Sequence, residues 1–256
     1  MVDFEEQGAI WWLFLSQNHF PYGLFTSSIA PTRLAILVTD EPLPSVAAKL
    51  GGFDAIFTSL LRTACESLDV PQPLESQLAL TAHDVVNGDP ATVYPDPDTI
   101  DAVFITGSSH SASSNQDWIE GRVRVIGVCF GHQIVARALG ARVGRSPHGW
   151  ELSVVKVGLT EEGKRVFGAG SLKIYQTHRD AVLEYPPGVV PLAHNQVANT
   201  GHGHPEFSPF MMGEMLRIRH RAGVIPDGPF ENAMARVADK HDGIAIARAF
   251  LRFLRE

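Results

Sequence analysis

Gly127-Val-Cys-Phe-Gly-His-Gln133 is the stretch of sequence that decides the fold. It follows the β-branched run Val123-Arg-Val-Ile126 and leads into Ile134-Val-Ala-Arg-Ala-Leu139, a pattern typical of a strand followed by a helix. A strand that turns sharply through glycines into a helix, with a nucleophilic residue at the turn, is a nucleophile elbow. Cys129 would stand at the turn, where the start of the helix favours a thiolate. The alternative is a buried, inert cysteine.

The residues before the elbow predict an α/β fold. Short apolar runs of strand length alternate with a helical pattern, which favours a mostly parallel sheet with helices on both faces. The predicted strands are residues 33–39, 77–82, 101–106 and 123–126, and the predicted helix is residues 53–64. Ligands bind such sheets at the carboxyl ends of the strands. Gly107 and Cys129 both follow strands, and the serine-rich residues 107–114 are either a site loop or a surface loop.

The second half of the chain has a less regular pattern. Residues 152–157 and 172–177 are predicted to be strands, separated by a helical turn at residues 160–167. Residues 209–221 and 244–254 are predicted to be helices. Between them, a Pro/Gly break from Pro226 to Pro229 precedes a short helical segment that ends at Val237.

The first 30 residues are predicted to be an N-terminal extension without an assigned function, and residues 31–256 to be one domain. The apolar run at residues 9–15 is far shorter than the roughly 20 residues of a membrane span. Acidic residues precede it where a signal peptide would carry Lys or Arg. We expect a segment that packs on the domain or stays partly disordered, and no membrane association.

The composition narrows the class of protein. A chain of 256 residues with 45% hydrophobic and 19% charged residues suits a globular domain. A net charge of −7 and a pI near 5.9 argue against a nucleic-acid partner. The two cysteines are far apart and form no disulfide framework, so a reducing, cytoplasmic setting is expected. The 11 histidines lack metal-ligand spacing, so we expect neither a metal nor a cofactor.

His204-Pro-Glu206 offers a base for the cysteine. A thiol nucleophile needs an imidazole within hydrogen-bond reach and a third group that orients the ring. In an extended segment, residues two apart point to the same side, so Glu206 can hold one ring nitrogen while the other faces Cys129. The alternative is a surface loop before a helix, but together with the elbow the catalytic interpretation is the stronger one.

These residues resemble a known family. Gly127-Val-Cys-Phe-Gly-His-Gln133, Thr177-His-Arg-Asp180 and Gly203-His-Pro-Glu-Phe207 occur in the order found in the class I, triad-type glutamine amidotransferases. The closest likeness is to the single-domain fungal and plant subgroup, and it runs from about Leu34 to Leu254. The resemblance implies a flavodoxin-like, three-layer αβα sandwich.

The resemblance also implies a mechanism with named roles. Cys129 would attack the side-chain amide of glutamine, release ammonia and form a γ-glutamyl thioester that water hydrolyses. His204 and Glu206 would complete the triad. Backbone N–H groups of Phe130 and of Gly107 or its neighbour would hold the oxyanion, a contribution of about 3–4 kcal/mol per donor. Gln133 would hold the amino-acid end of the substrate. His178 would have either a substrate-side or a structural role.

The chain departs from the subgroup in three segments. The crossover at residues 111–122 is short, whereas relatives have a fuller helix there. Residues 195–202 lead directly into the next motif, whereas relatives have an extra hairpin before it. Residues 1–30 match nothing in the subgroup. A missing sheet-flanking helix would expose roughly several hundred Å² of apolar surface, at ~25 cal/mol per Å². We therefore expect lower stability or a requirement for a partner.

Three functions follow from the resemblance. The first is a glutaminase-type amidotransferase that supplies ammonia to a separate synthetase, in fungal relatives often within a secondary-metabolite pathway. The second is a γ-glutamyl peptidase that uses the same triad on γ-glutamyl peptides or glutathione conjugates. The third is a non-catalytic subunit of a synthetase complex, in which the shortened segments misplace the triad.

Overall fold

The central element of the fold is a four-stranded parallel sheet. The computed structural model of the chain describes residues 10–11, 14–16, 30–109, 123–185, 188–195 and 203–255. The strands are arranged β4 (Leu78–Asp84), β3 (Thr32–Val38), β5 (Ala102–Ile105) and β6 (Arg124–Gly127), with every pair parallel. All four strands were predicted from apolar runs, and the predicted α/β class is confirmed.

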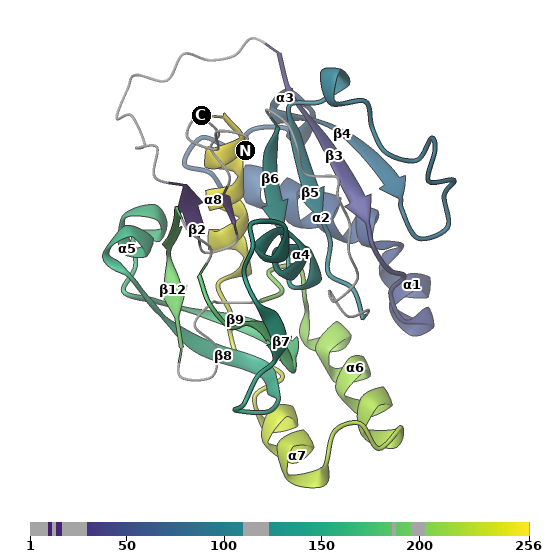
Figure 1. Cartoon of the computed structure of the whole chain (residues 1–256), viewed down its shortest axis with the longest axis vertical. Helices are drawn as coiled ribbons and strands as arrows, with labels where there is room; N and C mark the ends of the chain where they lie inside the picture. The colour runs from purple at the N-terminus through teal and green to yellow at the C-terminus, as the bar shows by residue number, and fades with distance from the viewer. Residues whose placement is uncertain are drawn as a thin grey trace.

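Helices cover both faces of this sheet, as Figure 1 shows. Helices α2 (Phe53–Glu66) and α8 (Gly243–Arg255) pack on one face, and α4 (Phe130–Ala138) packs on the other. Alternate residues of each strand therefore enter two separate cores. The first core contains Leu34, Ile36, Phe104 and Ile126 with Phe57, Leu61 and Phe250, and the second contains Leu37, Val103 and Ile105 with Val135 and Ala136. This is the predicted three-layer sandwich.

The strand register brings the predicted site together. Leu37 lies opposite Ile105, and Ile105 lies opposite Gly127, so β3, β5 and β6 end at one edge of the sheet. The residues that follow these strands, Thr39, Gly107 and Cys129, therefore meet at that edge.

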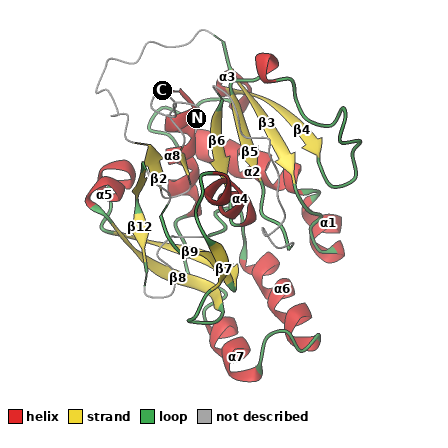
Figure 2. Ribbon diagram, in the orientation of Figure 1, coloured by secondary structure: helices red, strands yellow, loops and turns green. Residues whose placement is uncertain are grey.

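A second set of strands is antiparallel (Figure 2). Strands β12 (Ala193–His194), β8 (Glu151–Leu159) and β9 (Ser171–His178) form one sheet in that order. Strands β7 (Val143–Arg145) and β10 (Asp180–Val182) form a two-stranded sheet. The predicted strands at 152–157 and 172–177 and the helical turn α5 (Glu161–Phe167) are confirmed. The antiparallel pairing was not predicted.

The remaining helices correct two predictions and confirm a third. The elbow helix α4 begins at Phe130, not at residue 134, because the turn itself is its first turn. Helix α7 (Asp227–Ala235) includes Pro229, so the predicted break there is wrong. The first four N–H groups of a helix have no partner within it, so a proline in that turn is tolerated. Helix α6 (Pro209–Arg221) has the predicted bounds.

Short helices between the sheet strands were missed. These are α1 (Pro44–Leu50), α3 (Leu74–Gln77) and the 3-10 turn η2 (Pro97–Thr99). The run from Glu41 to Pro44 was read as a loop, yet Pro44 starts α1, the position where proline suits a helix.

The N-terminal segment contributes two short strands. Strand β1 (Ile10–Trp11) pairs with β2 (Phe14–Ser16), and β2 pairs with β11 (Val189–Pro191). The domain division at residue 30 stays a prediction. The predictions for the crossover at 111–122 and for residues 196–202 lie outside the described residues. Within the described ranges, the chain has no helix with the length and apolarity needed to span a membrane.

Candidate active site

The backbone of Cys129 has the conformation expected of an elbow. Its φ is 48° and its ψ is −102°, a region that L-residues rarely adopt, and it directly precedes α4. Two glycines make this turn feasible. A Cβ atom at Gly127 would lie 2.6 Å from the carbonyl carbon of Gly131, and one at Gly131 would lie 2.4 Å from the carbonyl oxygen of Ile105. The crowding that the sequence implied is therefore present, and it holds Cys129 at the sheet edge.

The strain at Cys129 predicts an inverted order of stability. Glycine normally destabilises relative to alanine, but at a positive φ it removes a cost of about 1–3 kcal/mol. We expect the Cys129→Gly variant to unfold at higher urea concentration than Cys129→Ala, with a free energy of unfolding about 1 kcal/mol larger. Urea titrations of the two variants measure this difference. Equal stability, or a more stable alanine variant, would show that the turn is not strained.

Gly107 lies against both Cys129 and His204. A Cβ atom at Gly107 would lie 3.6 Å from Cβ of Cys129 and 3.0 Å from Cε1 of His204. The end of β5, the elbow and the His204 segment therefore converge on one point. A side chain at position 107 would occupy the space between the thiol and the imidazole.

His204 is anchored by the antiparallel sheet. Its backbone N–H donates to the carbonyl oxygen of Tyr175 on β9 at 2.9 Å, an isolated bridge between the two segments. The residues after it form a turn, closed by the N–H of Phe207 to the carbonyl oxygen of His204. The expected extended conformation is therefore wrong. The Phe207 ring stacks on the imidazole instead, with centroids 4.1 Å apart.

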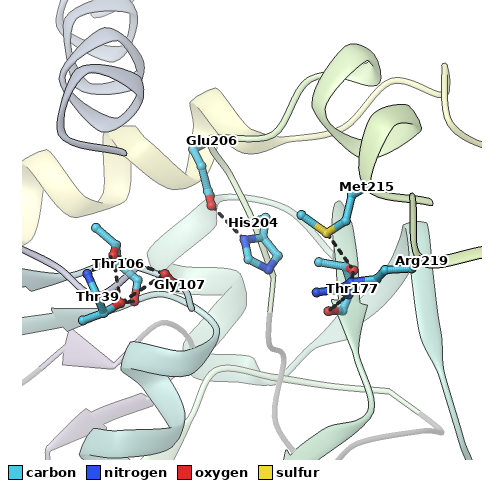
Figure 3. A network of polar contacts seen from close by, with 8 residues as sticks. All are labelled: Thr39, Thr106, Gly107, Thr177, His204, Glu206, Met215 and Arg219. Carbon is cyan, nitrogen blue, oxygen red and sulfur yellow. Dashed lines mark hydrogen bonds and ion pairs between the residues drawn. The ribbon is translucent and has the colours of Figure 1, made fainter. Parts of the chain in front are cut away.

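The imidazole of His204 is paired with Glu206, as Figure 3 shows. Nδ1 of His204 and Oε1 of Glu206 are 2.7 Å apart, and both side chains are buried. Burial alone lowers the pKa of a histidine, but here the negative charges of Glu206 and Cys129 outweigh it and raise the pKa of His204 to about 10. The ring is therefore held as an imidazolium between a carboxylate and the sulfur.

The other ring nitrogen faces the nucleophile. Nε2 of His204 is buried, and Cys129 acts on the ring both through its charge and through a side-chain hydrogen bond. Catalytic hydrogen bonds of this kind tighten further when substrate binds. The arrangement is that of a thiol, an imidazole and an orienting carboxylate.

Threonines at two strand ends hold the Gly107 loop (Figure 3). The carbonyl oxygen of Gly107 accepts hydrogen bonds from Oγ1 of Thr39 at 3.1 Å and of Thr106 at 3.2 Å. Asp40 accepts the backbone N–H of Ser109 at 2.6 Å. Because a trans peptide points its N–H away from its C=O, these contacts fix the direction of the Ser108 N–H. Sequence reasoning missed these residues, although hydroxyl groups that end adjacent parallel strands were a readable signal.

The two predicted substrate-side residues have protein partners. Nε2 of Gln133, on α4, donates to the carbonyl oxygen of Asp180 at 3.0 Å. Nε2 of His178 lies 3.0 Å from Oε2 of Glu151, and both side chains are buried. Burial and the neighbouring His178 lower the pKa of His132 to about 3. His178 thus belongs to a buried polar cluster beneath α4.

A further polar group borders His204 on the β9 side. Oγ1 of Thr177 accepts a hydrogen bond from Nη1 of Arg219 at 2.7 Å and lies 3.3 Å from the sulfur of Met215. In Figure 3, His204 lies between this group and the Thr39–Thr106–Gly107 group. Arg219 was assigned to a helix but to no site. Among the described residues, no three His, Cys, Asp or Glu side chains are placed to hold a metal ion.

Comparison with known proteins identifies the family. The profile described as "Glutamine amidotransferase class-I" matches residues 62–213, which is more than half of the chain. The chain belongs to the class I glutamine amidotransferase family, as its elbow and His204 motifs predicted.

Similar sequences occur in fungi and plants, and a bacterial structure shares the fold. A glutamine amidotransferase-like protein of Schizosaccharomyces pombe is 30% identical over 251 residues, which cover 88% of this chain and 99% of that protein. Gamma-glutamyl peptidase 3 of Arabidopsis thaliana is 25% identical over 72% of this chain and 80% of its own length. The crystal structure of a glutamine amidotransferase from Methylobacillus flagellatus shares the fold, with a TM-score of 0.59 at 17% identity over 89% of this chain and 94% of that one.

Proposed function

We propose that the protein hydrolyses the side-chain amide of glutamine through a Cys129–His204–Glu206 triad and supplies the ammonia to a separate acceptor enzyme. The observation that carries this proposal is the convergence of a strained cysteine, a buried His–Glu pair and the Gly107 loop at one edge of the parallel sheet. Family membership adds the reaction class.

The first half of the reaction forms a thioester. The Cys129 sulfur attacks the amide carbon, and the carbonyl π electrons move to its oxygen. When the tetrahedral intermediate collapses, the carbon–nitrogen bond breaks and Nε2 of His204 gives its proton to the leaving nitrogen, so ammonia departs. Glu206 keeps the other ring nitrogen in place throughout, because it is hydrogen-bonded to Nδ1.

The second half restores the enzyme. Water takes the position that ammonia left and gives a proton to Nε2 of His204 as its oxygen attacks the thioester carbon. The carbon–sulfur bond then breaks, the Cys129 thiolate and the His204 imidazolium are regenerated, and the new carboxylic acid leaves as glutamate after giving its proton to the solvent. No redox step or co-reactant besides water is required.

In this proposal, backbone N–H groups stabilise the negative charge that develops on the carbonyl oxygen of the substrate. The N–H of Phe130 is in the first turn of α4, where helix N–H groups have no partner within the helix. The second donor comes from the Gly107 loop, whose peptide direction Thr39 and Thr106 hold. Each donor contributes about 3–4 kcal/mol to the stabilisation of the oxyanion.

Gln133 and His178 complete the proposal on the substrate side. Gln133 is tied to Asp180 at the start of β10, and His178 to Glu151, so each is held in a single orientation. In this proposal Gln133 contacts the amino-acid end of glutamine, and His178 supports the same side of the substrate-binding site.

A γ-glutamyl peptidase is the second candidate, favoured by the Arabidopsis relative of that name. The triad chemistry is the same, but the leaving group is the amino end of a peptide in place of ammonia. A non-catalytic subunit is the third alternative.

Product analysis separates these candidates. Purified protein is incubated with L-glutamine and, separately, with glutathione, and ammonia, glutamate and cysteinylglycine are quantified. We expect equal amounts of ammonia and glutamate from glutamine. Cysteinylglycine from glutathione with no ammonia from glutamine would replace the proposal by the peptidase. No product from either substrate would leave the non-catalytic role.

A further inference from the structure

Arg219 is a cation beside the site whose charge no described residue neutralises. It extends from α6 to the end of β9, where Nη1 donates to Oγ1 of Thr177 at 2.7 Å and to its carbonyl oxygen at 3.4 Å. The guanidinium also lies over the Trp150 ring, with its carbon 5.8 Å from the centroid. Both protein acceptors are neutral, so the positive charge is positioned but not paired.

Two buried histidines in this region have a carboxylate partner. Within the described part of the chain, His204 is paired with Glu206 and His178 with Glu151, whereas Arg219 has no carboxylate within ion-pair distance. Burial lowers the pKa of Arg219, and the charges of Cys129 and Asp40 oppose this change. Cys129 is therefore close enough for the two charges to interact. A partly buried, unpaired guanidinium costs free energy unless an anion joins it.

We propose that Arg219 is a specificity-determining residue that binds the α-carboxylate of the γ-glutamyl group whose carbonyl carbon Cys129 attacks. This inference rests on the proposed function and adds the recognition of the substrate's acid end.

The chemistry of the site favours a carboxylate over other ligands. Any substrate that forms a γ-glutamyl thioester with Cys129 carries an α-carboxylate at the other end of the same short chain. The planar guanidinium matches a carboxylate through two parallel N–H donors. Thr177 engages Nη1 and sets the plane of the fork, which leaves the Nη2 edge for the ligand. The neutral carbonyl and hydroxyl partners keep the full charge available.

The test compares two variants of the same helix on three anilide substrates. Arg219→Met removes the charge and keeps the length of the side chain. Arg217→Met is the matched control, because Arg217 is 49% exposed and pairs with Glu214 at the surface. The substrates are γ-glutamyl p-nitroanilide, the glutaryl analogue that lacks the amino group, and the 4-aminobutyryl analogue that lacks the carboxylate. Far-UV circular dichroism and urea unfolding verify that each variant folds.

The expected pattern depends on the carboxylate. Arg219→Met lowers kcat/KM for the γ-glutamyl and glutaryl substrates by about 10- to 100-fold, mostly through KM, and leaves the 4-aminobutyryl substrate unchanged. Arg219→Lys recovers part of the loss. Arg217→Met resembles the wild type on all three. An equal loss on all three substrates would mean that Arg219 acts on the thiol, and no loss would mean that it has no part in the reaction. Either result overturns the inference.

Substrates with different leaving groups show which carboxylate of the substrate Arg219 binds. The anilide leaving group has no carboxylate, so a loss on anilides reports on the γ-glutamyl end alone. A loss seen with glutathione but absent with the anilides would assign Arg219 to the glycine carboxylate and contradict the inference. A wild-type protein that cleaves no substrate and takes up no glutamine-like chloroketone at Cys129 would reject the proposed function and, with it, this inference.

Discussion

Replacing Cys129 by alanine is expected to lower kcat for glutamine hydrolysis by at least about 10⁴-fold. Removal of a single triad nucleophile costs about 10⁶ in a well-studied serine protease, and no other described thiol lies at the site. Cys129→Ser should be nearly as inactive, because a hydroxyl gives up its proton far less readily than a thiol. Ammonia release under saturating glutamine measures the effect.

Cys65 provides the matched control. It is fully buried on α2, and burial raises the pKa of its thiol, which makes it a poor nucleophile. Cys65→Ala should keep kcat within about twofold of wild type and lower the free energy of unfolding by about 1 kcal/mol. A Cys129→Ala variant with appreciable activity, or a Cys65→Ala variant without it, would contradict the assignment of the nucleophile.

The second large effect is expected at Glu206. Glu206→Gln removes the charge that opposes the burial of His204 but keeps a group of similar shape. We expect kcat to fall by about 10³- to 10⁴-fold, as when the orienting carboxylate of a serine-protease triad is lost. His204→Ala should be at least as damaging, since it removes the proton carrier. If either variant retains near wild-type kcat, the triad is wrong.

The same pair predicts how stability depends on pH. The pKa of His204 is raised to about 10 in the folded state against an ordinary value of 6.5. Between these values the folded protein holds a proton that the unfolded chain has lost, so the pair's stabilisation is complete below about pH 6.5 and disappears as pH rises toward 10. Urea unfolding at intervals from pH 6 to 10 should show a smaller decline in the free energy of unfolding for Glu206→Gln than for wild type. Parallel curves would contradict the raised pKa.

Local patterns were sufficient to predict the parallel sheet and the elbow. The apolar runs that became β3 and β5 are buried on both faces over at least four residues, so each is readable without knowledge of its partners. The Cys129 turn could be predicted because its glycines are required by contacts within a few residues and one adjacent strand. The His204–Glu206 pair lies within three residues and was also readable.

Long-range pairings were not readable from the sequence. His178 and Glu151 meet because β8 and β9 pair in one register, which no residue pattern specified. Arg219 shares a face of α6 with the buried residues Met212 and Leu216, but only the contact between α6 and β9 brings it to Thr177. Pro44 and Pro229 each lie in the first turn of a helix, where proline is tolerated. They were read as breaks because no other local signal marked the start of these helices.

The most direct test of the account is the site of covalent modification by a glutamine-like chloroketone, followed by intact mass and peptide mapping. The account predicts one adduct per chain, located on Cys129, suppressed by excess L-glutamine and much slower in His204→Ala. An adduct on Cys65, or none on a folded protein, would contradict the claim that Cys129 is a nucleophile prepared by His204.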